Sequence, residues 1–154
     1  MTEFYAGQTA YQDLFEPKTL KMSTGDGDIT RGMLCTIKSD GYLKRADPLS
    51  GKPAIFPGGV FVAVQSVKAP AENGGATCQV ACVRSRVVLQ CGAGIPIGAP
   101  VQTADNSRTK IAAGATAPVA YSIIGTLYEF PGQPDKIVSE NNDFAVIDIG
   151  IGVN

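Results

Sequence analysis

Short runs of apolar and β-branched residues, separated by turn-forming residues, recur along most of this chain. Apolar and polar positions alternate in several of these runs, which is typical of strands with one buried face. No segment of twelve or more residues carries an apolar stripe with helical period. Many short strands favour a closed or sandwiched antiparallel sheet, so a mostly β fold is expected. The pattern predicts strands at 32–37, 42–43, 60–67 and 78–91, within 101–111, and at 120–130 and 144–149.

Turn-forming residues mark where these strands end. Asp40-Gly41 between two apolar runs is a strong hairpin signal, and Pro57-Gly58-Gly59 predicts another turn. The 18 glycines and 10 prolines among 154 residues are more than an average chain contains, as many turns would require. The alternation weakens near Arg84-Ser85-Arg86, so the long run 78–91 is expected to bend or bulge there.

Residues 1–22 differ from the rest of the chain. They lack periodicity but hold four of the aromatic residues, Phe4, Tyr5, Tyr11 and Phe15. Aromatic side chains are common anchors at protein interfaces. The sequence therefore predicts an extended N-terminal arm at 1–22 that binds a partner, followed by a barrel-like β domain at 23–154. Packing of the arm on its own domain is the alternative, and one helical turn is expected just before Pro17.

The charge of the chain is balanced, with 13 basic and 14 acidic residues. A net charge of −1 gives no field that attracts nucleic acid or anionic lipid. No apolar run reaches the roughly 18 residues of a membrane span, and residues 1–5 do not resemble a signal peptide. We therefore expect no nucleic-acid or membrane partner, synthesis in the cytoplasm, and reduced cysteine thiols.

Arg84 and Arg86 form one of the few close pairs of basic residues. On a strand they would share one face, flanked by apolar neighbours. Because arginine is enriched at interfaces, one interpretation is a contact with a partner subunit. The other interpretation is a solvated face.

Candidate catalytic groups are few. The chain has no histidine, which removes the commonest general base and a common metal ligand. Asp26-Gly27-Asp28 resembles the start of a calcium loop, but Ile37 stands where the loop's last glutamate belongs, so a solvated turn is expected. We predict no catalytic, cofactor-binding or metal-binding residues, and we do not expect an enzyme.

The four cysteines are interpreted as small buried apolar residues. Cys78 and Cys82 would lie about 13 Å apart on one strand, too far for a shared zinc ion or a disulfide. A site across strands stays open as an alternative, since Cys35 and Cys91 could approach each other from neighbouring strands.

A series of weak motifs follows one another in a particular order. Its members are a step onto a strand at 29–35, a strand at 59–64, two strands at 78–83 and 87–89, the step Ile-x-x-Gly-x-x-Val at 95–101, a polar turn and strand at 105–111, and strands at 123–127 and 144–149. In this order the chain resembles the small head-decoration, or cement, proteins of tailed bacteriophages. The N-terminal arm and the loop at 131–143 depart from the shorter members of that family.

The resemblance implies a tulip-like or barrel-like β domain on the outside of a capsid. Such a protein would bind the major capsid protein, often as a homotrimer, and stabilise the shell. The expected function is therefore that of a structural virion protein that decorates the capsid surface, without a cofactor. The alternatives are a head–tail or tail subunit, a small-ligand-binding barrel, and an enzyme with a carboxylate or Ser-Lys site.

Overall fold

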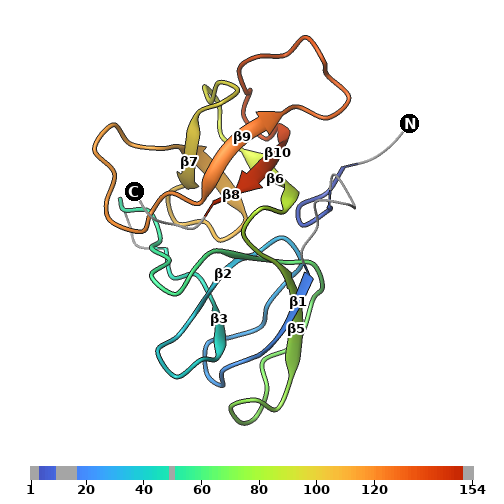
Figure 1. The fold of residues 1–154 in the computed structure, drawn as a ribbon, viewed down its shortest axis with the longest axis vertical. Helices are drawn as coiled ribbons and strands as arrows, with labels where there is room; N and C mark the ends of the chain where they lie inside the picture. The colour runs from blue at the N-terminus through green and yellow to red at the C-terminus, as the bar shows by residue number, and fades with distance from the viewer. Residues whose placement is uncertain (1–3, 10–16, 49–50, 151–154) are drawn as a thin grey trace.

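A computed structural model describes residues 4–9, 17–48 and 51–150 of the chain (Figure 1). Within these ranges all regular elements are strands, which confirms the mostly β prediction. No helix in the described ranges is long and apolar enough to cross a membrane. The strands are β1 (Pro17–Lys21), β2 (Leu34–Ile37), β3 (Leu43–Arg45), β4 (Phe61–Ala63), β5 (Thr77–Ala81), β6 (Arg86–Cys91), β7 (Pro100–Thr103), β8 (Lys110–Ala113), β9 (Gly125–Glu129) and β10 (Phe144–Ile149).

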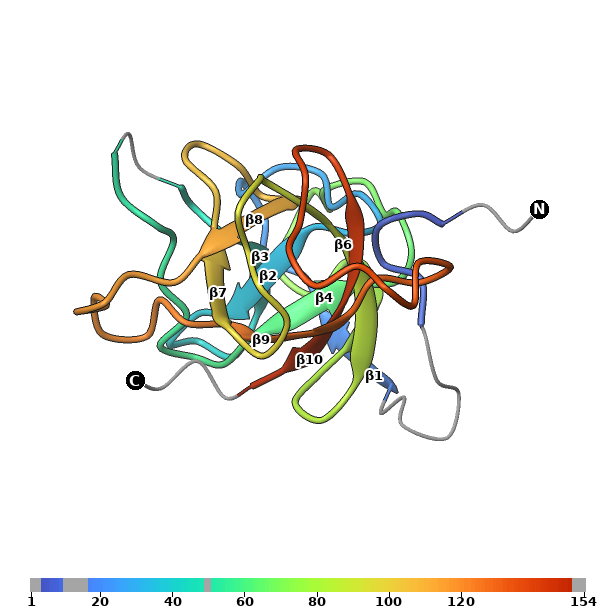
Figure 2. The same ribbon diagram turned by 90° about the horizontal axis from the view of Figure 1, so that it is seen from above.

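Five strands close into a barrel in the order β10-β6-β8-β7-β9, seen from above in Figure 2. Its neighbouring pairs are antiparallel except for β6 and β8, which run parallel with Gln90 opposite Lys110. Strand β7 reverses the chain between β6 and β8 and pairs antiparallel with β8, so β8 runs in the direction of β6. The barrel is therefore mixed, whereas the sequence predicted a wholly antiparallel one.

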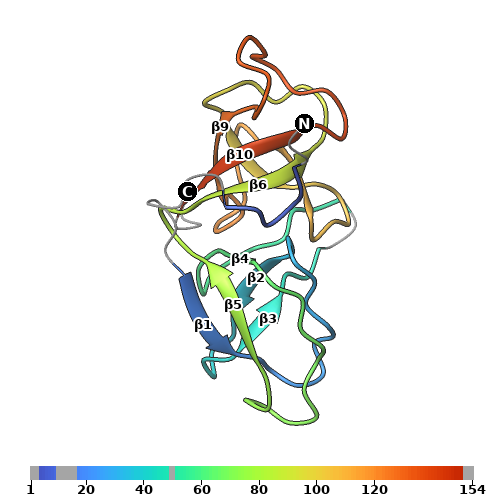
Figure 3. The same cartoon turned by 90° about the vertical axis from the view of Figure 1, so that its right-hand side faces the viewer.

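The other five strands form an antiparallel sheet in the order β1-β5-β4-β2-β3, below the barrel in Figures 1 and 3. The ends of this sheet approach each other, because Met22, directly after β1, forms a bridge with Leu43 of β3. The amide of Ser23 also donates to the carbonyl of Leu43 (3.0 Å). The sheet thus curls toward closure, and the connection from β5 to β6 carries the chain from the sheet into the barrel.

Two apolar cores follow from the alternation of side chains along the strands. One core joins the barrel interior to the facing side of the sheet, so that Leu34 packs in the same cluster as Leu89 and Ile147. The other core covers the opposite side of the sheet and includes Cys35 and Met22. Because successive strand residues point to opposite faces, Leu34 enters the first core and Cys35 the second.

The predicted strands agree with the structure where alternation continues without interruption. Strand β10 occupies the predicted range 144–149. The predicted run 78–91 is instead two strands in different sheets, β5 and β6, because the bend expected there is a complete change of sheet. The strand predicted at 60–67 is reduced to β4, since Val67 leaves the sheet and forms a bridge with Ile29.

Residues 17–21, which the sequence placed in the N-terminal arm, form strand β1 and pair with β5 from Pro17 opposite Ala81 to Lys21 opposite Thr77. An edge strand tolerates proline at its start and often carries lysine, and both features weaken its apolar pattern. The edge position explains why this strand was missed. The helical turn expected just before Pro17 lies outside the described residues.

Candidate interaction surfaces

The described part of the arm, residues 4–9, runs along strand β6 of the protein's own barrel (Figure 3). The amide of Gly7 donates to the carbonyl of Val88 (2.8 Å), and the amide of Val88 donates to the carbonyl of Gln8 (2.8 Å). Strand β8 pairs only with the last two residues of β6. The arm therefore satisfies backbone groups along the part of this edge that β8 leaves open.

Gly7 explains how the arm fits between the barrel and the sheet. Its φ of 86° lies in the left-handed region that favours glycine. A Cβ at this position would lie 2.8 Å from the carbonyl oxygen of Ala63 and 2.8 Å from the amide nitrogen of Gly32. Beyond Gly7, Thr9 forms an antiparallel bridge with Val87. The arm thus contacts both halves of the molecule at once.

The aromatic side chains of the arm meet different surroundings. Tyr5 is 46% exposed, and the guanidinium carbon of Arg31 lies 4.5 Å from the centre of its ring. Phe4 is half-buried, and its ring lies 3.5 Å from where a Cβ on Gly132 would be. Two further side chains of the predicted partner-binding set lie outside the described residues, Tyr11 and Phe15. Partner binding by these four aromatic residues stays a prediction.

The sequence analysis expected Arg84 and Arg86 to share one face of a strand, but only Arg86 lies in a strand. Arg84 lies in the turn between β5 and β6 with φ 76°, and its amide donates to the carbonyl of Ile149 (3.0 Å). Arg86 begins β6, where its guanidinium carbon lies 3.8 Å from the ring centre of Tyr128 and its Nε lies 3.7 Å from a carboxylate oxygen of Asp148. The barrel itself therefore holds the Arg86 side chain, and a role for either arginine in binding a partner stays a prediction.

The Asp26-Gly27-Asp28 turn, weighed above as a calcium loop, braces the sheet through its carboxylates. Asp26 accepts hydrogen bonds from the hydroxyl of Ser23 and the ammonium group of Lys38. Asp28 accepts a hydrogen bond from the amide of Ala69 (2.8 Å). In the described part of the chain, no three histidine, cysteine or acidic side chains are grouped so that they could hold a metal ion.

All four cysteines are buried, and none of them forms a disulfide. Cys35, Cys78 and Cys82 belong to the core on the side of the sheet that faces away from the barrel. Cys91 belongs to the core that includes the barrel interior. The approach of Cys35 to Cys91 that the sequence left open is therefore absent. Burial raises the pKa of the Cys78 thiol to about 11, and burial, with a smaller contribution from Asp143, raises that of Cys91 to about 12.

These raised pKa values predict a loss of stability in alkali. Between about pH 9 and pH 11 the unfolded chain releases its thiol protons while the folded chain keeps them, so the free energy of unfolding should fall as pH rises. We expect urea-induced unfolding to show lower stability at pH 10.5 than at pH 8. The free energy of unfolding of a Cys78→Ala variant should fall less between pH 8 and pH 10.5. Equal pH dependence of the variant and the parent would contradict a contribution from this thiol.

An exposed apolar patch lies on two loops at the end of the barrel. Ile137 is 69% exposed, and Ile97 and Val138 beside it are exposed as well. The amide of Ile97 donates to the carbonyl of Ile137 (2.9 Å), and Pro96 forms a bridge with Val138. We call Ile97, Ile137 and Val138 the barrel-end patch. Sequence analysis assigned both segments to loops and did not identify this surface.

A hydrogen-bonded charge pair holds the loop that presents this patch. The ammonium group of Lys136 lies 2.7 Å from a carboxylate oxygen of Asp143, which also accepts the amide of Glu140 (2.7 Å). Burial raises the pKa of Asp143, but the hydrogen bonds from Lys136 and from the Glu140 amide outweigh it and lower that pKa overall. The loop that presents Ile137 and Val138 of the barrel-end patch is therefore braced.

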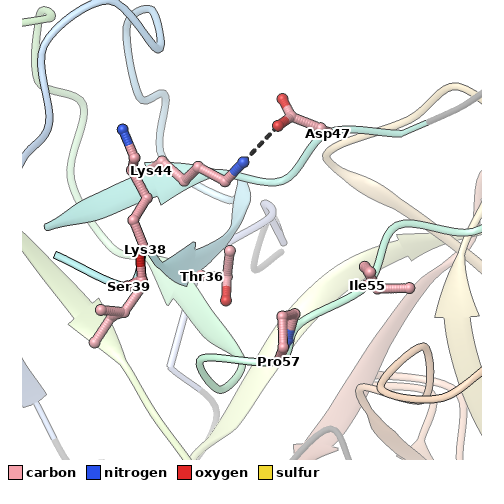
Figure 4. Close-up of a pocket in the computed structure, with 8 residues that line it drawn as sticks. Thr36, Lys38, Ser39, Lys44, Asp47, Ile55 and Pro57 are labelled. Atoms are coloured by element: carbon pink, nitrogen blue, oxygen red, sulfur yellow. Dashed lines mark hydrogen bonds and ion pairs between the residues drawn. The ribbon is translucent and has the colours of Figure 1, made fainter. Parts of the chain in front are cut away.

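A second surface feature is a pocket of about 390 Å³ at the β2–β3 end of the sheet (Figure 4). Thr36 of β2 lies within it, with Ile55 and Pro57 on the facing loop. Thr36 is only 4% exposed, and its hydroxyl has no hydrogen-bond partner among the described residues. A buried hydroxyl without a partner costs about 1–3 kcal/mol, so the fold keeps an unfavourable group at this position.

Charged side chains form part of the pocket lining and contact other charged groups near it. The ammonium group of Lys38 lies 3.4 Å from a carboxylate oxygen of Asp26, and that of Lys44 lies 2.6 Å from a carboxylate oxygen of Asp47. Asp47 also lies 3.9 Å from the guanidinium group of Arg108. The lining itself contains two lysines and one aspartate, Lys38, Lys44 and Asp47, so its net charge is +1.

An exposed apolar loop lies next to this pocket. The amide of Phe56 donates to the carbonyl of Tyr121 (2.9 Å), which joins the pocket wall to the loop before β9. Ile55 in the wall and Val119 and Tyr121 in the loop are all exposed. Tyr121 has φ 65°, a backbone conformation that is costly for a bulky residue and that often marks functional sites.

Comparison with known proteins finds a similar fold in a solved structure but no similar sequence. No protein-family model matches the sequence, and no curated protein matches it. Among solved structures, the head fiber gp8.5 N base in bacteriophage phi29 is similar, with a TM-score of 0.50 and 12% sequence identity. The match covers 88% of this chain and 95% of that chain. The two proteins share a fold.

The shared fold with this head-fiber base spans nearly the whole of both chains. The series of strand and glycine motifs in the sequence predicted a barrel-like β domain, and the structure contains a closed barrel. No local signal identified the pocket, because Thr36 and Ile55 come from segments that only the folded chain brings together.

Proposed function

We propose that this chain is a structural protein of a tailed-phage virion that binds the outer surface of the head and stabilises the shell. The observation that carries the proposal is the fold shared with a phage head-fiber base over 88% of this chain and 95% of that one. The resemblance of the sequence to capsid decoration proteins supports the same assignment independently of that structure. A head–tail or tail subunit is the alternative within the same class.

We propose further that the protein acts by binding and not by catalysis. The chain has no histidine, and a thiolate rather than a thiol is the nucleophile of cysteine chemistry. Cys78 and Cys91 have pKa values raised to about 11 and about 12, which leaves both thiols protonated near neutral pH. The ion pair Lys136–Asp143 and the hydrogen-bonded Asp26 serve to brace loops.

The proposed partners are the major capsid protein and further copies of this chain, arranged as a homotrimer. A protein that reinforces a shell must connect several shell subunits, and closed symmetry is the usual way to do so. The barrel-end patch supports this, because Ile97, Ile137 and Val138 are exposed and the loop with Ile137 and Val138 is braced. Exposed apolar clusters on a folded surface commonly mark protein interfaces.

Reconstruction of shells with and without this protein tests the proposal. Phage particles made after deletion of the gene for this protein should bind the purified protein. In a reconstruction, the added density should lie on the outer surface of the head in groups of three. Bound particles should also resist heat better than bare ones. A matched protein with Ile137→Ser should bind less well, whereas Val83→Ser, an exposed position outside the barrel-end patch and the β2–β3 pocket, should bind like the parent. Absence of the protein from the head, or isolated single copies on it, would contradict the proposal.

A further inference from the structure

The pocket at the β2–β3 end of the sheet has features of a binding site that the shared fold does not explain. Its volume of about 390 Å³ lies within the range of sites that hold small groups. Figure 4 shows the buried Thr36 between Ser39 and the loop with Ile55 and Pro57. The question is which chemical group this space accepts.

The buried hydroxyl of Thr36 would be stabilised by a hydrogen-bond partner from outside the chain. It is nine-tenths or more buried, lines the pocket, and lacks a partner in the described ranges. No side chain or backbone group in the described ranges supplies one. An incoming carbonyl or carboxylate oxygen would accept this hydrogen bond.

The walls of the pocket favour an aliphatic group. Ile55 is 48% exposed although it lines the pocket, and Pro57 lies next to it. The exposed Val119 and Tyr121 continue this apolar surface beyond the wall, through the hydrogen bond from Phe56 to Tyr121. An aliphatic side chain that enters here would remove several apolar groups from water.

The charge of the pocket favours an acidic group. Two ammonium groups and one carboxylate line the pocket, and that carboxylate, Asp47, contacts both Lys44 and Arg108 from a largely exposed position. Asp47 thus takes the place that a carboxylate of a partner would occupy. A ligand with its own carboxylate could replace Asp47 as the partner of Lys44.

We propose that this pocket binds an acidic, aliphatic segment of another polypeptide. The aliphatic side chain lies against Ile55 and Pro57, a backbone oxygen accepts the Thr36 hydroxyl, and a neighbouring carboxylate pairs with Lys44. In naming a shell protein as the source of this segment, the inference rests on the proposed function. The chemistry of the pocket itself does not depend on that assignment.

Titration of the full-length protein with the capped tripeptide acetyl-Asp-Leu-Asp-amide, followed by amide NMR shifts, tests the chemistry. Saturable shifts are expected at Thr36, Lys44 and Ile55. The same peptide with lysine in place of aspartate should bind at least about tenfold more weakly. No saturable shift at these positions up to about 10 mM peptide, or equal binding of the lysine peptide, would overturn the proposal.

Single substitutions separate a ligand site from a structural role. Thr36→Val and Lys44→Ala should each weaken peptide binding about tenfold, whereas Asp47→Asn should strengthen it a few-fold by releasing Lys44. Thr36→Val should not lower the melting temperature, because it removes an unpaired buried hydroxyl. Thr126→Val and Lys18→Ala, both exposed and on other strands, are matched controls that should bind like the parent. Unchanged binding by Thr36→Val and Lys44→Ala would overturn the proposal.

Shell binding by the same variants distinguishes this inference from the proposed function. If the parent binds shells and Thr36→Val and Lys44→Ala bind them less, the segment comes from the shell. If the parent binds shells and both variants bind equally well, the shell protein is not the source, although the function stands. If the parent binds no shell at all, the proposed function fails, and the peptide titration alone decides the pocket.

Discussion

Replacing Gly125 with alanine is expected to destabilise the fold by about 3 kcal/mol, or about 6–12 °C in melting temperature. A Cβ at this position would lie 2.1 Å from the backbone oxygen of Asp148. That oxygen belongs to β10, which pairs with β9 at this point, so it cannot move aside without disturbing the closed barrel. Thermal unfolding of the Gly125→Ala variant measures the effect.

Gly92→Ala is the matched control for this substitution. A Cβ on Gly92 would lie 3.6 Å from its nearest neighbour, the carbonyl oxygen of Ile111, which is ordinary van der Waals contact. Its melting temperature should therefore stay within a few degrees of the parent. If Gly125→Ala were as stable as Gly92→Ala, the close approach of β9 and β10 would be wrong.

Deletion of residues 1–16 is expected to lower the stability of the domain by about 2–4 kcal/mol. The deletion removes both backbone hydrogen bonds between the arm and Val88. It also uncovers the edge of β6 at Val88, whose side chain is fully buried. It also removes the packing of Gly7 against Gly32 and Ala63. The conformational entropy released by the arm offsets part of this loss. Urea-induced unfolding of the truncated and parent proteins measures the difference.

A second measurement on the same truncated protein tests whether the arm also binds a partner. Tyr5→Ala leaves the backbone pairing of the arm intact and removes an exposed ring, so it is the control for stability. Reduced shell binding by Tyr5→Ala at unchanged stability would support the partner-binding prediction. A truncated protein that binds shells with full affinity would contradict that prediction. Full stability of the truncated protein would contradict the intramolecular role.

Much of the local structure could be predicted because it depends on neighbouring residues. The alternation in 144–149 predicted β10 with its observed bounds, and the interrupted alternation near Arg84 located the point where the chain leaves one sheet for the other. The cysteines are buried, as their interpretation as small apolar residues predicted. Strand β1 was missed because an edge strand with proline and lysine has little apolar pattern.

The candidate sites could be predicted only in part. The aromatic residues of the arm were recognised from composition, but nothing local indicated that residues 7–9 pair with β6. The barrel-end patch joins loops around Ile97 and Ile137 that are distant in sequence. Their contact depends on which strands become neighbours, and turn residues do not specify that choice.

By itself, the sequence determined that this protein is a β fold of short strands, without histidine and with buried thiols. These properties depend on residue identity and on side-chain alternation, which act within a few residues. Only the tertiary structure decided that the strands divide between a closed barrel and a curled sheet, that the arm lies on β6, and that Thr36 meets Ile55 in one pocket. The physical reason is that backbone pairing and core packing join distant segments, and their free energy depends on the whole arrangement of strands.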